Sequence, residues 1–279
     1  MKSIVTNKKI QISINSSSFK LLDWININNL YWETLSMNTN AIELLEKNSH
    51  NISWIQLSSN KNAGDLLEKH INYIDWNKVC ANIKNIKLLE KYYQSISWYY
   101  LSLNPYAIDL LTANQDKIDW TYLSCNPKAI DLLTSNQNKI DWYFLSCNPN
   151  AIDLLTANPE KIIWNYHLSK NPNAVHLLAA NPDKIDWYHL SANSGAIDLL
   201  IANQDKIDWT QLSGNPNAMT LLLLNNEKIN WRVLSANPSA IDLLRENQDL
   251  IDWYIFSRNP AIFEHIDSYY PNNKRRKYY

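Results

Sequence analysis

The chain has 279 residues and repeats one pattern of apolar and polar positions along most of its length. A Leu-Leu pair recurs with a 22-residue step, from Leu44-Leu45 to Leu243-Leu244. Tryptophan keeps the same step, with one 23-residue step after Trp164, at Trp32, Trp54, Trp76, Trp98, Trp120, Trp142, Trp164, Trp187, Trp209, Trp231 and Trp253. A fixed period of about 20 to 50 residues is typical of repeat proteins, whose units pack only against their neighbours.

The pattern within one unit predicts two short helices. In residues 104–125, Ala107, Ile108 and Leu111 fall on one side of a first helix and Asp109 falls opposite. A second helix of about six residues runs from Trp120 to residue 125. Helices this short are unstable alone. We therefore expect them to stack on neighbouring units, with the tryptophans buried in one continuous core.

Polar residues predict where these helices begin and end. An Asn stands six or seven residues after each Trp, and Pro follows it in seven units, which predicts an N-cap with proline at the first helical position. Asp, Ser or Asn precedes Trp in nine of eleven units, for example Asp75, Ser97, Asp119 and Asp252, which predicts the N-cap of the second helix.

The first helix is expected to end at a second asparagine in the left-handed conformation. This asparagine occurs at Asn48, Asn114, Asn136, Asn158, Asn181, Asn203, Asn225 and Asn247.

The predicted fold is all-α: an α-solenoid of about eleven 22-residue two-helix repeats with atypical terminal caps. We expect one repeat domain at residues 19–266, with an N-terminal cap at 19–32 and a cap helix at 259–266. Residues 1–18 are expected to be a loosely ordered extension, and residues 267–279 a basic tail. Eleven stacked units predict a curved rod about 100 Å long. Only three glycines argue against β-solenoids and propellers, and the unit lacks the alternating L-x-L strand of leucine-rich repeats.

Composition narrows the compartment and the partners. The net charge of −1 gives no bulk attraction for nucleic acid or anionic membranes, and no apolar run is long enough to span a bilayer. The N-terminus has no apolar signal region and the three cysteines form no C-x-x-C motif, so we expect an intracellular, cytoplasmic protein. Cys125 and Cys147 lie one unit apart, about 8–10 Å between helix axes, and are expected to be free thiols.

The consensus Asn-Pro-x-Ala-Ile-Asp-Leu-Leu-x-x-Asn-x-x-Lys-Ile-Asp-Trp-x-x-Leu-Ser resembles short Trp-containing tandem repeats encoded by giant DNA viruses of the mimivirus and klosneuvirus type. The likeness covers about residues 30–266, and the Asn, Ile, Lys and Tyr bias fits an AT-rich genome. The resemblance implies an origin and an architecture, with the host cytoplasm, a viral factory or the virion as location. It carries over no activity and no site residue.

No catalytic signature is present, so we expect no enzyme, no cofactor and no metal site. The sequence has no Gly-rich phosphate loop, G-x-S-x-G elbow or H-E-x-x-H helix. His167, His176 and His189 are the nearest approach to a cluster, but no carboxylate or Cys completes a ligand set at a recognisable spacing. They are expected to be surface histidines.

An acidic row follows the outward side of the first helices. Its main members are Asp109, Asp131, Asp153, Asp198 and Asp242. Six consecutive lysines, Lys117, Lys139, Lys161, Lys184, Lys206 and Lys228, are expected to offset this charge. A solvated face is therefore favoured over a recognition stripe.

A second stripe consists of the first, second and fifth residues after each Trp, on the side of the second helix away from its leucine. It is apolar mainly at Tyr99, Tyr100, Leu103, Tyr122, Cys125, Tyr143, Phe144 and Cys147. Two interpretations stay open: these rings pack against adjacent units, or they form an exposed docking patch at residues 99–147.

The predicted function is a non-catalytic scaffold that binds an unidentified protein or an extended peptide along the second-helix face. One alternative is a self-associating structural component of a virion or viral factory. Another is an RNA-binding helical repeat, which would need a basic face that this neutral chain lacks. The run Lys274-Arg275-Arg276-Lys277 is a nuclear-import or anionic-contact candidate, and a solvated charge run is the favoured interpretation.

Overall fold

The computed structural model describes residues 19–164 and 166–266. The predicted N-terminal extension and the basic tail with Lys274 to Lys277 lie outside these residues. The described residues form twenty-one α-helices, thirteen short 3-10 helices and two strands. The repeated two-helix architecture confirms the predicted all-α repeat fold.

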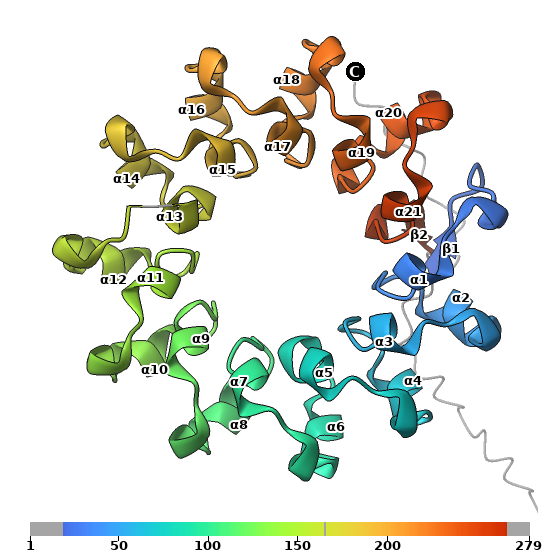
Figure 1. Ribbon diagram of the computed structural model, residues 1–279, viewed down its shortest axis with the longest axis horizontal. Helices are drawn as coiled ribbons and strands as arrows, with labels where there is room; N and C mark the ends of the chain where they lie inside the picture. Colours follow the sequence, from blue (N-terminus) through green and yellow to red (C-terminus); the bar gives the residue numbers. More distant parts are fainter. Residues whose placement is uncertain (1–18, 165, 267–279) are drawn as a thin grey trace, which may run out of the picture.

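Each unit contributes one helix to an inner row and one to an outer row (Figure 1). The inner helices are α1 (Trp32–Leu35), α3 (Trp54–Leu57), α5 (Trp76–Asn82), α7 (Trp98–Leu101), α9 (Trp120–Ser124), α11 (Trp142–Leu145), α13 (Tyr166–Lys170), α15 (Trp187–Ser191), α17 (Trp209–Ser213), α19 (Trp231–Leu234) and α21 (Trp253–Phe256). The outer helices are α2 (Ile42–Lys47), α4 (Gly64–Glu68), α6 (Ile86–Lys91), α8 (Ile108–Thr112), α10 (Ile130–Thr134), α12 (Ile152–Ala157), α14 (Val175–Ala179), α16 (Ile197–Ile201), α18 (Met219–Leu223) and α20 (Ile241–Glu246).

A short 3-10 helix, which the sequence pattern did not reveal, follows each outer helix. These are η2 (Ser49–Asn51), η3 (Ile71–Tyr73), η4 (Tyr93–Ser95), η5 (Gln115–Lys117), η6 (Gln137–Lys139), η7 (Pro159–Lys161), η8 (Pro182–Lys184), η9 (Gln204–Lys206), η10 (Asn226–Lys228) and η12 (Gln248–Leu250). The remaining ones are η1 (Ile27–Asn29), η11 (Pro238–Ala240) and η13 (Pro260–Ile262).

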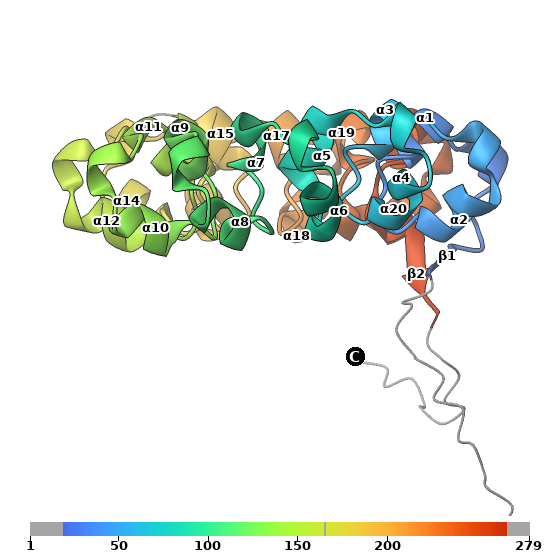
Figure 2. The ribbon, with the colours of Figure 1, turned by 90° about the horizontal axis from the view of Figure 1, so that it is seen from below.

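The array closes into a ring, so the predicted curved rod about 100 Å long is wrong (Figure 1). Strand β1 (Phe19–Leu21) pairs antiparallel with β2 (Phe263–His265). The expected cap helix at 259–266 is instead η13 followed by β2. Seen from the side, the inner helices lie toward one rim, and the strand pair projects from the opposite rim (Figure 2). The two terminal segments thus pair with each other and close the ring, and we call the strand pair β1–β2 the clasp.

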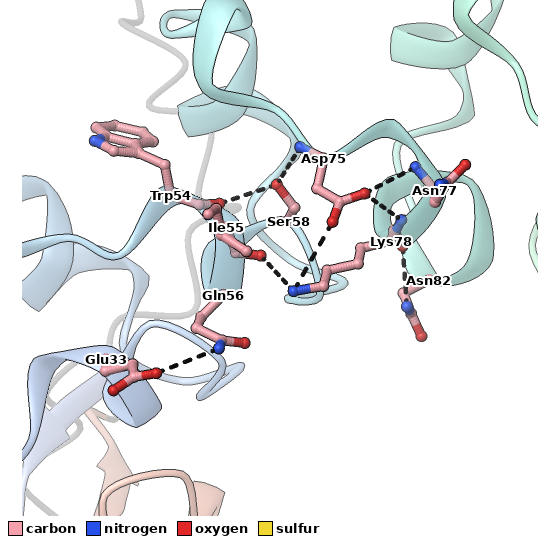
Figure 3. Close-up of polar contacts among 9 residues, drawn as sticks. All are labelled: Glu33, Trp54, Ile55, Gln56, Ser58, Asp75, Asn77, Lys78 and Asn82. Carbon is pink, nitrogen blue, oxygen red and sulfur yellow. Dashed lines mark hydrogen bonds and ion pairs between the residues drawn. The ribbon is translucent and has the colours of Figure 1, made fainter.

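The N-caps of the inner helices are largely as predicted. The side chains of Asp75, Asp119 and Asp252 accept hydrogen bonds from backbone N–H groups in the first turn, as do Asp141, Asp186, Asp208 and Asn230. Ser97 makes no such bond. A serine at the end of most inner helices instead bridges two units, as Ser58 does by donating to the Trp54 carbonyl and accepting from the Asp75 N–H (Figure 3).

The asparagines expected to cap the outer helices have a different role. Helix α12 begins at Ile152, so Asn148 is not its N-cap. Asn148 is fully buried, and its Nδ2 donates to the carbonyls of Ser124 (3.0 Å) and Asn126 (2.9 Å) in the preceding unit. Its Oδ1 accepts from the N–H of Asn150, which closes a local turn. One side chain therefore joins two units and shapes the turn.

This bridge recurs around the ring and we call it the asparagine ladder. Its members, each donating to two carbonyls of the preceding unit, are Asn38, Asn60, Asn104, Asn126, Asn148, Asn171, Asn193, Asn215, Asn237 and Asn259. Asn82, at the equivalent position, is exposed and donates to Lys78 in its own helix. The junction between α3 and α5 thus lacks the ladder.

The predicted left-handed end of the outer helices is also wrong. No described residue has a positive φ, and Asn114 has φ −133°. Its Nδ2 instead donates to the Leu110 carbonyl four residues earlier (2.9 Å). The side-chain amide thereby satisfies a carbonyl that the helix end leaves without a partner.

The core lies between the two rows and contains the leucines, while the tryptophans are only half-buried. Leu111 and Leu123 are fully buried, and the Trp side chains pack against the edge of this core. Lys139 Nζ lies 4.4 Å from the centre of the Trp120 ring, and Lys161 Nζ lies 4.7 Å from that of Trp142. These lysines were expected to offset the acidic row, but they cover tryptophan faces in a cation–π arrangement.

Replacing a ladder asparagine tests this architecture. We expect Asn148→Ala to lower the free energy of unfolding by about 2–4 kcal/mol, because two buried carbonyls lose their donor. The matched control is Asn82→Ala, at the same repeat position but outside the ladder, with an expected loss below about 0.5 kcal/mol. Urea unfolding followed by tryptophan fluorescence measures both, and equal losses would contradict the ladder's role.

The half-buried tryptophans give a second test. Trp142→Ala is expected to cost about 2–3 kcal/mol, less than the 3–5 kcal/mol of a fully buried aromatic residue. Lys161→Ala, which removes only the cation over that ring, is expected to cost about 0.5–1 kcal/mol. A near-neutral Trp142→Ala in thermal unfolding would show that the tryptophans contribute little to the core.

Candidate functional site

The candidate site is the side of the inner helices that faces away from the outer row. Leu123, three residues after Trp120, is buried between the rows. The first residue after each Trp lies about 200° from that leucine around the helix, so it points away from the core. We call this surface the inner-helix face.

The structure brings the predicted aromatic residues together along this face. Tyr99 and Tyr122, on successive helices, have ring centres 4.2 Å apart, and Tyr122 is 5.8 Å from Phe144. Tyr99 also contacts Tyr100 on its own helix at 5.0 Å. The predicted stripe is therefore continuous over α7, α9 and α11.

Ring contacts extend this surface beyond the predicted limit at residue 147. Tyr143 lies 4.4 Å from His167, and Tyr166 lies 5.1 Å from His189, which contacts Tyr188 at 4.9 Å. We call the whole set the aromatic arc, and it consists of Tyr99, Tyr100, Tyr122, Tyr143, Phe144, Tyr166, His167, Tyr188 and His189. It spans five successive inner helices, from α7 to α15.

Exposure separates two groups within the arc. Tyr99 is 43%, Tyr143 37% and Tyr188 50% exposed. Tyr100, Tyr122 and Phe144 are half-buried between neighbouring helices. The sequence left two interpretations open, packing between units and exposure for docking. Each describes part of the stripe, because some rings pack between units and others are exposed to solvent.

Phenol hydroxyls join neighbouring units across the arc. The Tyr99 hydroxyl donates to the Tyr122 hydroxyl, and this bond raises the pKa of Tyr99 to about 12 because ionisation would remove the donor. The hydroxyls of Tyr143 and Tyr166 share a hydrogen bond of 2.7 Å, which raises the pKa of Tyr143. Gln211 Nε2 donates to the Tyr188 hydroxyl.

The histidines of the arc are not the surface histidines that we expected. His167 and His189 are half-buried, whereas His176 is exposed. Burial lowers the pKa of His167, and the nearby Lys170 ammonium lowers it further. His189 Nδ1 lies 3.0 Å from Asp186 Oδ2, the carboxylate that also caps its helix. Both imidazoles serve as packed members of the arc.

Cys125 and Cys147 are half-buried free thiols, as predicted, and lie on adjacent helices of the same face. The interaction between the two neighbouring thiols raises the pKa of Cys125 and lowers that of Cys147. Their Sγ atoms also lie 3.4 and 3.1 Å from the carbonyls of Tyr122 and Phe144. Leu103 is half-buried at the same repeat position.

Outside the arc the inner-helix face is mixed: Ile55 (61% exposed) and Tyr254 (44% exposed) lie at the first position after Trp, and most other positions are polar. Gln56 Nε2 reaches Glu33 at 3.5 Å, and Lys78 Nζ donates to the Ile55 carbonyl. Figure 3 shows these side chains following one another over successive inner helices, with Trp54 pointing to the other side. The continuous row of contacting rings thus runs from α7 to α15, and a separate pair, Tyr31 with Tyr254, lies between the first and last units.

The predicted acidic row is exposed on the outer helices. Its members Asp109, Asp131, Asp153, Asp198 and Asp242 are all exposed, and Asp242 pairs with Arg245 in its own helix. One surface was missed. Ile201 on α16 is 49% exposed, Leu223 at the end of α18 is 55% exposed, and the following Leu224 is 77% exposed. Other units have Thr, Ser, Ala or charged residues such as Glu46, Lys47 and Arg245 at these positions, and this contrast is the signal that could have revealed the surface.

Among residues 19–164 and 166–266, no group of three or more His, Cys, Asp and Glu side chains is arranged to hold a metal ion. No helix within the same residues is both long and apolar enough to cross a membrane.

The hydroxyl pairs yield a testable pKa. Tyr122→Phe removes the acceptor of the Tyr99 hydroxyl, so the pKa of Tyr99 should fall from about 12 toward the ordinary value near 10. Selective ¹³Cζ labelling of tyrosine and NMR titration measures it. Tyr166→Phe is the control, because it breaks the Tyr143 pair alone. An unchanged Tyr99 titration in Tyr122→Phe would contradict the hydrogen bond.

Comparison of the chain with protein-family models, with curated proteins and with solved structures found no match. The resemblance to giant-virus repeats therefore stays a prediction.

Proposed function

We propose that this protein is a non-catalytic binding module that holds an extended polypeptide segment against the aromatic arc. The observation that carries the proposal is the arc itself: contacting rings on five successive inner helices, with Tyr99, Tyr143 and Tyr188 exposed. Exposed apolar surface of this kind is typical of interaction sites.

The fold does not require these exposed rings. Thr121 and Thr210 occupy the same repeat position as Tyr99, and their units form the same helices. A ring that serves only the fold would be expected in every unit. Tyrosine combines a rigid apolar ring with a hydroxyl and is favoured as an interface anchor.

The polar part of the face favours a polypeptide over nucleic acid. Glu33, Lys78 and Arg232 place both signs of charge on the inner helices. Single-stranded nucleic acid is usually held by a continuous basic groove beside stacking aromatic residues. An extended peptide needs no such charge, because its apolar side chains pack on the rings and its backbone groups hydrogen-bond to hydroxyls.

A self-associating structural component remains a second candidate, on one specific observation. The exposed Ile201, Leu223 and Leu224 form an apolar surface on the outer row. Head-to-tail polymerisation, by contrast, is disfavoured because the first and last units already cover each other. Light scattering coupled to size-exclusion chromatography over a range of concentrations, with Leu223→Thr/Leu224→Ala as the variant, tests this candidate.

The main test uses substitutions that the repeat already contains. Random linear peptides are selected on the immobilised ring by phage display, and the selected peptides are measured by fluorescence anisotropy. Tyr99→Thr/Tyr143→Thr/Tyr188→Thr is expected to weaken binding roughly tenfold or more, since several anchors are lost. Its melting temperature should change little, because Thr121 and Thr210 are tolerated at this position.

The matched control is Tyr106→Lys, which replaces a tyrosine of the same 43% exposure on the outer side by the residue that the next unit carries at Lys128. It should leave binding unchanged. The proposal fails if no peptide is enriched, or if the triple variant binds the selected peptides as tightly as the natural chain.

A further inference from the structure

The closed ring sets the size of anything that passes through it. Its inner helices, eleven of them in the described chain, are spaced by about 8–10 Å, which gives a circle roughly 30 Å across between helix axes. Subtracting the radius of a helix with its side chains on each side leaves an opening about 20 Å wide. A strand or a single helix, about 10–12 Å wide, fits this width. A folded domain of about 100 residues is about 30 Å across and does not.

A partner therefore enters either by a free end or by opening the ring. The only junction without a covalent connection is the seam between the first and last units. At the seam, Asn38 makes both ladder bonds, to the carbonyls of Ser257 and Asn259, and the Tyr31 N–H donates to Ser257 Oγ. These bonds repeat those of an internal junction such as the one between α9 and α11.

The seam also carries contacts that internal junctions lack. Strands β1 and β2 pair over three residues, with Lys20 opposite Glu264 and an ion pair of 2.9 Å between them. The Leu22 N–H donates to the Ile262 carbonyl, and Trp24 packs on Phe256 with ring centres 5.8 Å apart. The seam thus has the ladder bonds and the serine bond of an internal junction, together with these additional contacts.

The junction with fewer buried bonds lies elsewhere, between α3 and α5. Asn82 is outside the ladder there, and Gly64 and Asn85 replace the Ile and Ala of other units. A Cβ on Gly64 would lie 2.8 Å from the Asn85 Cβ, so the two changes depend on each other. Exposed contacts, such as Asn85 with Asp65 (3.0 Å), take the place of the buried bonds. Because the chain is continuous here, this junction bends without opening the ring.

We infer that the seam stays closed and that the partner is a polypeptide with a free end, which threads through the ring as a strand or single helix. This inference rests on the proposed binding to the aromatic arc. Because of the additional seam contacts, opening the ring at the seam costs more free energy than bending it at the α3/α5 junction. The width of the opening is therefore adjusted at that junction while β1 and β2 stay paired. The ring therefore excludes segments flanked on both sides by folded domains.

A reversible lock on the seam tests the inference. Lys20→Cys/Glu264→Cys places two cysteines at partnered positions of β1 and β2, within reach of a disulfide. The native thiols are removed by Cys80→Ser, Cys125→Ala and Cys147→Ala, which are residues that other units carry at these positions. Anisotropy and melting temperature of this background are measured first, in the reduced state.

Three ligands are compared on the reduced and the oxidised ring: a selected peptide, the same peptide fused to a folded domain of about 100 residues at one end, and the peptide with such domains at both ends. We expect the first two to bind both rings with equal association rates, and the third to bind neither. Binding of the doubly blocked peptide to the reduced ring alone would show that the seam opens. Binding of the doubly blocked peptide to both the reduced and the oxidised ring would show that the peptide attaches at a rim without threading, which would contradict the inference.

Failure of the inference is distinguishable from failure of the proposed function. If the free peptide binds neither ring, the proposed site on the aromatic arc is wrong and the threading inference falls with it. If the free peptide binds and Tyr99→Thr/Tyr143→Thr/Tyr188→Thr abolishes that binding, the doubly blocked peptide alone decides how the partner enters.

Discussion

The buried asparagine amide between successive units is the interaction on which the rest of the structure depends. At Asn126 the amide donates to two carbonyls of the preceding unit, at 3.0 and 3.1 Å, and its oxygen accepts from the N–H of Lys128. Asp could not donate these bonds, and Gln would place the amide one methylene further away. Since the same two bonds fix a unit to the previous one at every junction except α3/α5, a similar small rotation accumulates at each step, about 33° for eleven units in one turn.

Much of this fold could be predicted because its signals are local. The 22-residue step, the two helices and the aspartate caps depend on residues within one unit, and Asp119 and Asp252 cap their helices as expected. The role of Asn148 could not be predicted, since a helix N-cap and a buried bridge between units have the same sequence signature. Ring closure depends on the total rotation added up over all units, and the sequence of one unit does not give its rotation accurately enough to predict that total.

The candidate site shows the same division. The sequence placed Tyr99, Tyr122 and Phe144 on one stripe because they share repeat positions on adjacent helices. It could not assign their exposure, since Tyr99 stands in solvent while Tyr122 is half-buried beneath its neighbours. The arc continues to His189 because side chains on the next inner helices pack against one another, and this packing between units cannot be read from the sequence of one unit.

The ladder also explains why the surface can vary without loss of the fold. Positions such as 99, 121 and 143 face away from the core and make none of the ladder bonds, so the same fold accommodates Tyr in some units and Thr in others. Binding residues are held best on rigid elements. The aromatic arc spans α7 to α15, where each junction retains its ladder asparagine, from Asn126 to Asn193. The seam and the α3/α5 junction lie outside this stretch, so the ring is able to bend beside the arc while the relative positions of its tyrosines stay fixed.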